Sequence, residues 1–373
     1  MDHLFLASFS EIASYVGYIL IAILILLIMI TVHELGHYIA GKIFKFGIDE
    51  FAVGFGPKIF KKKKKNGEIF SVRVLPIGGF CAFRGEDDES ADPSAFNNKK
   101  WWQRIIVLVS GALMNYITAL FVIMLMFGIY GQTTLMTYKV APSTEIATEY
   151  CFQDKDIIIS ANGKNIYLTT DLMSAVAGNK KGDKVDFVIR RGGEEKNVSI
   201  ELREDAVFKN VEDMSKLYST LGIYYETNES GSMINGGLYS TSVRFNFFQT
   251  IGRSFDYSFK LAGTVFTVLG QLLTGALGIS SLGGTVTTIA VTAEAIQFGG
   301  FRNLLNIASF IGVNLAVFNL LPFPALDGSR AVFTAIEGIR KKPVPRRVEG
   351  IIHTVGLFLL LAFAILVDLQ RCF

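Results

Sequence analysis

Two histidines and a glutamate form the stretch of the sequence that is best suited to chemistry. His33 and His37 are four residues apart, and Glu34 follows the first of them. On an α-helix, residues i and i+4 lie one turn apart on the same face, so both imidazoles can reach one metal ion. Glu34 is placed beside them, where its carboxylate can accept a proton from a water molecule on that metal. The pattern, common in soluble metalloproteases, predicts a catalytic zinc site.

A second polar group lies far along the chain, inside and just after an apolar stretch. Asn314 and Asn319 belong to this stretch, Pro322 and Pro324 break it, and Asp327 follows at once. Asparagine is costly in lipid unless it faces protein, substrate or water, and each proline frees backbone groups that then need partners. A catalytic zinc usually takes a third protein ligand and keeps one position open for water. Asp327 is therefore the predicted third ligand.

The asparagines allow two interpretations. In the first, Asn314 and Asn319 form hydrogen bonds with an extended substrate, as does a glycine-rich strand that contains Gly78 and Gly79. A substrate inside a bilayer is normally helical, and it must be unwound before its peptide carbonyl becomes accessible. In the second interpretation the asparagines only hold helices together, as is common between membrane helices.

Both polar groups lie in a sequence that is typical of a membrane protein. The chain has 373 residues, and 50% of them are hydrophobic. Four apolar stretches are long enough to cross a bilayer, at approximately residues 16–44, 105–130, 304–321 and 351–367. Buried helices of a large soluble protein are the alternative, but several such stretches in one chain favour membrane spans. The first is too long for a signal-peptide core and lacks a small-residue cleavage site, so we expect it to be retained.

Basic residues indicate which side of the membrane each loop faces. They are concentrated between the first and second stretches, including Lys61–Lys65, and between the third and fourth, including Arg346 and Arg347. By the positive-inside rule both loops face the cytoplasm, so the segment between the second and third stretches and both termini are expected outside. The lysine run has no interleaved aromatic residues, and we predict no nucleic-acid partner. The three cysteines are widely spaced and indicate neither a disulfide framework nor a cysteine-rich zinc site.

The expected topology brings the two polar groups to the same depth. His33 lies about 17 residues into the first span, roughly 25 Å deep at a rise of 1.5 Å per residue. The third span runs in the same direction, from outside to inside, and Asp327 follows its end. Both groups are therefore expected in the cytoplasmic half of the membrane, as a shared metal site requires.

Two further segments have recognisable patterns. Asn66-Gly67 separates two β-favouring runs, which predicts a hairpin. Its apolar, glycine-rich character is typical of strands that dip into a membrane where protein or a wet cavity covers them, and an ordinary cytoplasmic hairpin is the alternative. Residues 140–203 alternate as expected for a small sheet with a helix. Its edge could bind a peptide as an added strand, or the module could be a spacer that binds nothing.

The ordered set of motifs resembles one known family. The sequence closely resembles the bacterial site-2 proteases, which are intramembrane zinc metalloproteases, and among them the RseP/RasP branch. The resemblance covers nearly the whole chain. It rests on His33–His37, Gly54–Pro57, Leu75–Phe80, Gly111, Asn115, Asn314, Asn319, Pro322, Pro324 and Leu326–Gly328.

The resemblance implies roles for these residues. His33, His37 and Asp327 would bind Zn²⁺, and Glu34 would be the catalytic residue. The residues implied to handle the substrate are Asn314, Asn319, Pro322, Pro324, Gly78 and Gly79, the last two in a membrane-re-entrant hairpin. The family further implies a PDZ-like external domain and a place in the bacterial cytoplasmic membrane. Its substrates are single-pass membrane proteins, such as anti-sigma factors and remnant signal peptides.

The expected fold is an α-helical polytopic membrane protein. It has four transmembrane helices, a re-entrant β-hairpin and an inserted extracytoplasmic PDZ-like α/β domain. The expected transmembrane segments are 1–44, 104–130, 303–328 and 351–373. Between them we expect a cytoplasmic-side loop with the hairpin at 45–103, the PDZ-like domain at 131–205, a linker with interfacial helices at 206–302, and a cytoplasmic loop at 329–350.

The pattern bears on three possible functions. An intramembrane zinc endopeptidase explains the whole pattern. A catalytically silent scaffold that binds peptides would need no general base, and Glu34 is intact. A metal transporter would favour acidic or histidine-lined spans, and the second and fourth stretches show little of this.

Overall fold

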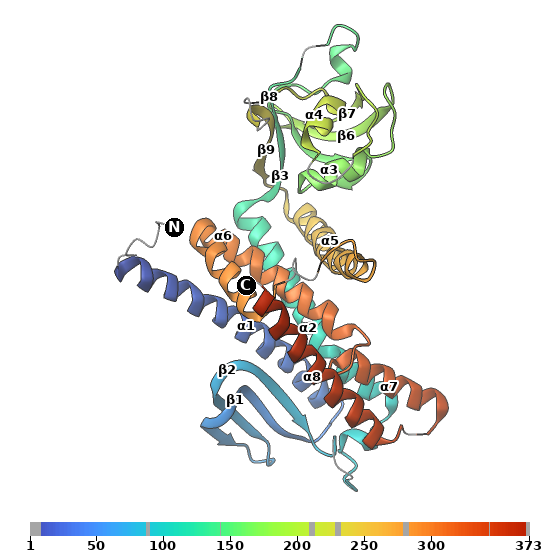
Figure 1. Cartoon of the computed structure of the whole chain (residues 1–373). Helices are drawn as coiled ribbons and strands as arrows, with labels where there is room; N and C mark the ends of the chain where they lie inside the picture. The colour runs from blue at the N-terminus through green and yellow to red at the C-terminus, as the bar shows by residue number, and fades with distance from the viewer. Residues whose placement is uncertain are drawn as a thin grey trace. The chain divides into compact units, whose positions relative to one another are not determined.

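The computed structural model describes residues 9–86, 90–141, 143–208, 213–227, 233–278, 283–342 and 344–370 (Figure 1). The ends of the first and last predicted segments, 1–8 and 371–373, lie outside these ranges. The chain forms two compact units. One consists of Met1–Leu125 and Tyr257–Phe373, and the other of Met126–Asp256.

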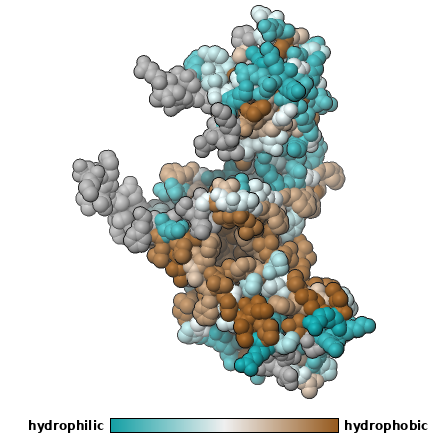
Figure 2. All heavy atoms as spheres, turned by 45° about the vertical axis from the view of Figure 1, so that its right-hand side comes forward, coloured by the Kyte–Doolittle hydropathy of each residue, from teal (hydrophilic) through white to brown (hydrophobic). Residues whose placement is uncertain are grey.

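Long apolar helices dominate the first unit. Among the described residues, four helices are long and apolar enough to cross a membrane: α1 (Phe9–Ile43), α2 (Trp101–Tyr130), α6 (Thr285–Leu320) and α8 (Arg346–Gln370). Figure 2 shows hydrophobic residues gathered over the surface of this unit, as expected for helices solvated by lipid. The four predicted spans are therefore present as helices, and the protein is a multi-pass membrane protein.

α6 begins earlier than the expected third segment, which started at residue 303. Its first part is rich in threonine, lies in the segment where a linker with interfacial helices was expected, and is helical from Thr285. Gly300 separates the two parts with φ +56° and ψ −145°, a conformation that a residue with a side chain rarely adopts. The glycine therefore kinks the helix without ending it.

Small residues and apolar contacts join the helices around α1. Ile25 and Met29 of α1 are buried against Ile296, Ala308 and Ile311 of α6. On another side of α1, Gly36 faces the backbone of Ser110 and Gly111 in α2 so closely that a Cβ at Gly36 would overlap it. Close approach at small residues is a usual way for membrane helices to associate. It brings the histidine face of α1 against α2.

The predicted hairpin is present and belongs to the first unit. Strands β1 (Ile48–Lys63) and β2 (Ile69–Phe83) pair antiparallel, with Ala52 opposite Phe80 and Lys63 opposite Ile69. Gly54 and Gly56 have φ near +86°, at shifts in the strand register. These bulges bend the hairpin, which lies beside α1 (Figure 1).

A buried glutamate ties the hairpin turn to the end of α1. The Glu68 side chain is only 1% exposed, and it accepts hydrogen bonds from Lys42 and Lys64. Burial raises the pKa of Glu68, but the hydrogen bonds from Lys42, Lys64 and Asn66 outweigh it and lower the pKa to about 2. Glu68 therefore stays ionised in the folded protein and holds the lysines in place.

The first unit also contains the part of α5 (Phe247–Leu273) from Tyr257 onward and two short helices. A 3₁₀ helix, η1 (Phe96–Asn98), precedes α2, and α7 (Asp327–Arg340) follows α6 after a break at Leu321–Leu326. A nearly buried ion pair between Arg104 and Glu337, at 2.7 Å, joins α7 to α2. The first residue of α7 is thus held relative to α2.

The second unit is a sheet with helices on it. The strand order is β7-β6-β4-β3-β9-β8, with β5 paired to β4. The strands are β3 (Gln132–Tyr138), β4 (Ile157–Ala161), β5 (Lys164–Asn165), β6 (Lys184–Arg191), β7 (Glu194–Glu201), β8 (Tyr225–Thr227) and β9 (Met233–Val243). The helices are η2 (Thr148–Tyr150), α3 (Thr169–Val176), α4 (Met214–Leu221) and the first turns of α5 (Phe247–Leu273).

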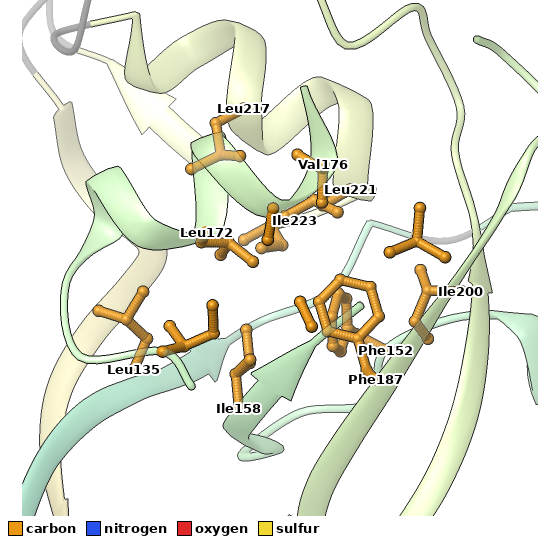
Figure 3. Close-up of a cluster of buried hydrophobic side chains, with 14 of the residues drawn as sticks. Leu135, Phe152, Ile158, Leu172, Val176, Phe187, Ile200, Leu217, Leu221 and Ile223 are labelled. Atoms are coloured by element: carbon orange, nitrogen blue, oxygen red, sulfur yellow. The ribbon is translucent and has the colours of Figure 1, made fainter. Parts of the chain in front are cut away.

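The core of this unit lies between the sheet and its helices. Figure 3 shows Leu172 of α3 and Leu217 of α4 directed toward Ile158 and Phe187 of the strands, and all four are buried. The sheet extends beyond the expected domain at 131–205, because β9 pairs with β3 and β8 pairs with β9. Such pairing between distant segments leaves no local pattern in the sequence.

Candidate active site

The two histidines of α1 and the aspartate that begins α7 converge. Asp327 Oδ2 lies 2.9 Å from His33 Nε2 and 3.2 Å from His37 Nε2, and the two Nε2 atoms are 3.1 Å apart. One ligand atom from each residue lies within 4.8 Å of the others. The residues are far apart in the chain, but the α1–α6 contact and the turn after α6 bring them together.

Neighbouring groups orient both imidazoles with Nε2 toward this centre. His37 Nδ1 donates a hydrogen bond to the carbonyl of Val107, at 2.8 Å, which leaves the Nε2 lone pair free. His33 Nδ1 lies 3.5 Å from the side-chain nitrogen of Asn115, whose Oδ1 is buried without a partner among the described residues. The oxygen and nitrogen of an Asn amide are assigned from their hydrogen bonds. If the Asn115 amide is rotated by half a turn, Oδ1 accepts a hydrogen bond from His33 Nδ1–H. Both rings then present the same kind of ligand atom.

The donor set and its surroundings fit a zinc ion. Two imidazole nitrogens and one carboxylate oxygen are the protein ligands of many catalytic zinc sites. Gly111 of α2 makes room for them. A Cβ at this position would lie 2.8 Å from His33 Cε1 and closer still to His37 Nε2. Only glycine lets α2 approach the histidine pair this closely.

Glu34 borders a polar cavity beside the three side chains. The cavity has a volume of about 250 Å³ and is lined by Ile30, His33, Glu34, Asn115, Leu315, Asn319, Ala325 and Asp327. A Cβ at Gly79 of β2 would lie 3.4 Å from Glu34 Cγ, so the hairpin approaches the glutamate at a glycine. The carboxylate is thus placed next to a space large enough for water or a peptide group.

The residues expected to handle substrate are divided among several positions. Asn319 lines the cavity, whereas Asn314 is absent from its lining and has a buried Oδ1 without a partner among the described residues. Pro322 and Pro324 lie in the turn between α6 and α7. Gly78 has φ +100°, and a Cβ there would overlap the ring of Phe55. Gly78 therefore shapes the hairpin, and Gly79 is the glycine that meets Glu34.

A second cavity lies on another side of Glu34 and Asp327. It has a volume of about 310 Å³, and its lining includes His37, Glu86 and Arg330. Arg330 Nη1 pairs with Glu86 Oε1 at 2.6 Å. Asp327 and Glu34 thus border both cavities, whereas His33 borders the first and His37 the second.

Sequence reasoning missed one polar residue near this centre. His353 of α8 contacts the turn that precedes Asp327. An ionisable residue inside an apolar span is a functional candidate by default, and this signal was available for His353. The Glu86–Arg330 pair had no such signal, because both residues lie in polar segments.

The comparisons with known proteins decide the family. The model of peptidase family M50 matches residues 21–363. The chain belongs to peptidase family M50. A candidate zinc metalloprotease from Clostridium perfringens is 34% identical over 95% of this chain and 98% of its own length. One from Clostridium acetobutylicum is 30% identical over 94% and 96%, and the zinc metalloprotease RasP of Oceanobacillus iheyensis is 27% identical over 93% and 97%.

Membership of family M50 confirms several expectations from the sequence. The protein is a zinc metalloprotease of the site-2 type, and its cofactor is Zn²⁺. It is embedded in a membrane by apolar helices. The expected similarity to the RseP/RasP branch is confirmed by the match to RasP.

Proposed function

We propose that this M50 protease is an intramembrane endopeptidase that cuts transmembrane segments of single-pass membrane proteins. The observation that carries the proposal is the meeting of His33, His37 and Asp327 within 4.8 Å, beside Glu34, on helices apolar enough to span a bilayer. Polar catalytic groups are costly inside a bilayer, and cleavage of a soluble substrate would not require them there. Anti-sigma factors and remnant signal peptides are the proposed substrate classes.

In the proposed mechanism His33, His37 and Asp327 hold the zinc ion. When bound, zinc polarises a peptide carbonyl and makes water easier to deprotonate. Glu34 takes the proton from water and later gives it to the leaving amine. Val107 and Asn115 keep the two imidazoles in the tautomer that offers Nε2.

The substrate is proposed to bind in an extended form. Within the described ranges no other strand pairs with the two-stranded hairpin, and a strand added to its edge would pass beside Gly79 and Glu34. Asn319 on the cavity wall would form hydrogen bonds with the unwound backbone. Pro322 and Pro324 keep the adjacent turn out of a helical conformation, which leaves room for this segment. The hairpin would then be re-entrant, covered by protein where it enters the membrane.

We also propose a place and a topology for the protein. The membrane is the bacterial cytoplasmic membrane, with the hairpin and the α7–α8 loop on the cytoplasmic side and both termini outside. The β-rich unit, Met126–Asp256, is then extracytoplasmic. A sheet with helices α3 and α4 on one face suits a PDZ-like role that restricts access of bulky ectodomains. We propose no nucleic-acid partner.

Cleavage of a model single-pass substrate in proteoliposomes, with zinc analysis of the purified protein, tests the proposal. We expect Glu34→Gln to bind zinc and to lose nearly all cleavage, whereas Glu145→Gln, at an exposed position of the β-rich unit, cleaves like wild type. His37→Ala and Asp327→Ala are expected to lose zinc. Wild-type cleavage by Glu34→Gln would contradict the mechanism. Full zinc in both ligand variants would contradict the proposed ligand set.

A further inference from the structure

A histidine of the fourth membrane helix holds the turn that leads to Asp327. The backbone N–H of Ala325 donates a hydrogen bond to His353 Nδ1, at 3.0 Å. Ala325 is two residues before Asp327 and also lines the cavity beside Glu34. α8 therefore contacts the wall of the active site through a polar side chain.

The turn needs such a contact because its own backbone is poorly stabilised. Pro322 and Pro324 have no N–H, and Ala325 has φ +75°, which is uncommon for a residue with a side chain. Within the turn, Leu326 N–H donates to the carbonyl of Phe323 at 3.1 Å. An Ala325 N–H left without an acceptor where the turn faces the apolar helix α8 would be costly. His353 supplies its acceptor.

α8 is shaped to bring His353 to this position. Gly356 lies one turn further along α8, and a Cβ there would overlap Pro324. The glycine thus lets the helix pack directly against the turn. Phe333 of α7 meets the His353 ring edge to face, with centroids 5.8 Å apart. The imidazole is fixed between the turn and α7.

The other ring nitrogen has no comparable partner. His353 Nε2 is buried and makes no hydrogen bond within the described part of the chain. The nearest acidic group, Glu349 Oε1, is 3.8 Å away, beyond hydrogen-bond distance. Since Nδ1 accepts a hydrogen bond, Nε2 carries the ring proton. The hydrogen bond from Ala325 therefore explains why this apolar helix contains a histidine.

We propose that His353 is a positioning residue for the metal site. By accepting the Ala325 N–H, it fixes the turn that directs Asp327 toward His33 and His37. The inference rests on the proposed ligand role of Asp327. His353 itself is assigned no contact with zinc or with the substrate.

The test compares variants that keep or remove the acceptor at the position of Nδ1. The Asn amide oxygen can take the place of Nδ1, whereas the Gln oxygen reaches further, toward the place of Nε2. His353→Leu and His353→Gln are expected to weaken zinc binding about 10-fold to 100-fold, the usual effect of losing support behind a ligand. His353→Asn should stay within a few-fold of wild type. Thr354→Val, at an exposed position of α8, is the matched control and should bind zinc normally.

Zinc affinity is measured by chelator competition on the full-length protein in detergent, and cleavage of the model substrate is measured in parallel. Wild-type affinity in His353→Leu would overturn the inference. So would equal losses in His353→Asn and His353→Gln, because a role in packing alone does not distinguish them. If His353→Leu fails to fold, the Asn and Gln pair decides the question.

One further variant separates this inference from the proposed function. Asp327→Ala removes the ligand itself. Full zinc affinity in Asp327→Ala contradicts the proposed ligand set. Loss of zinc in Asp327→Ala together with normal affinity in both His353→Leu and His353→Gln contradicts only the role of His353.

Discussion

At the residue scale, the candidate site depends on how closely α2 approaches the histidine pair. Gly111 has no side chain, and the space that a Cβ would need is taken by the two imidazoles. Asn115, one turn further along α2, borders the same cavity as His33. One helix face thus supplies both the space for the two imidazoles and a polar group beside His33.

Gly111→Ala adds only one methyl group, yet we expect it to weaken zinc binding strongly. The added methyl group overlaps His37 Nε2, so either the imidazole or α2 must move. Zinc affinity should fall at least 10-fold, as for other losses of ligand orientation, and cleavage should fall with it. Chelator competition measures the first and the model-substrate assay the second. Gly128→Ala is the matched control in the same helix, since a Cβ there meets nothing within 4 Å. Normal zinc binding in Gly111→Ala would contradict the close approach of α2 to the two imidazoles.

Asn115→Leu is expected to lower cleavage about 10-fold to 100-fold. Leucine has a similar volume but cannot accept the His33 Nδ1–H, so the tautomer and the orientation of that ring are no longer fixed. Steady-state assays with the model substrate measure the loss. Asn115→Asp retains an acceptor and should recover part of the activity. Equal activity in the Leu and Asp variants would show that the contact with His33 is unimportant.

At the element scale, polar contacts join the hairpin and the turn after α6 to neighbouring helices. Glu68 ties the hairpin turn to α1 through Lys42, and His353 ties α8 to the turn before α7. The strands and helices themselves follow from apolar pattern and glycine placement. The positions of the hairpin and the turn relative to His33, His37 and Asp327 also depend on a few polar groups that are costly to leave unpaired.

Glu68→Gln should destabilise the protein in a pH-dependent way. The pKa of Glu68 is lowered to about 2, so its contribution to stability is complete above its ordinary value of 4.5 and is lost as the pH falls toward 2. Lys42 and Lys64 are 38% and 44% exposed, and water can replace the carboxylate. The loss near neutral pH is therefore only about 1–2 kcal/mol.

Thermal unfolding in detergent from pH 7 to pH 3 measures this effect. The difference in Tm between wild type and Glu68→Gln should be constant above about pH 5 and shrink below it. Glu194→Gln is the control, since this side chain is 79% exposed and lies 3.7 Å from Lys196. A Tm difference that grows as the pH falls would contradict the assignment.

The elements differ in how far the sequence reveals them. The helices and the hairpin carry local signals: apolar length, Asn66-Gly67, and the i, i+4 spacing of His33 and His37. The place of Asp327 followed from matching the depths of two spans. A helix before residue 300 was expected, but its continuation into the third span was not, because Gly300 suggests an end. His353 carries the signal of an ionisable residue in an apolar span, but its partner, the turn before Asp327, is seen only in the folded chain.

At the scale of the whole molecule, the two units bury separate cores. One cluster, including Leu172, Phe187 and Leu217, belongs entirely to the β-rich unit. Others, including Ile25 and Ile296, belong to the helical unit. Each unit therefore has its own source of stability, and the proposed topology assigns them to different solvents, water for the β-rich unit and lipid for the helical spans.

Cysteine labelling on intact cells tests that topology. With Cys81, Cys151 and Cys372 replaced, Lys62→Cys reports on the hairpin and Lys155→Cys on the β-rich unit, both at exposed positions. The basic loops resist transfer across the membrane, so a membrane-impermeant maleimide should label Lys155→Cys and leave Lys62→Cys unlabelled until the cells are opened. Retained cleavage by both variants shows that each is inserted correctly. Labelling of Lys62→Cys alone would invert the topology and place the zinc site near the outer surface. Labelling of both on intact cells would mean that an odd number of spans no longer separates the two positions, and the four-span arrangement would fail.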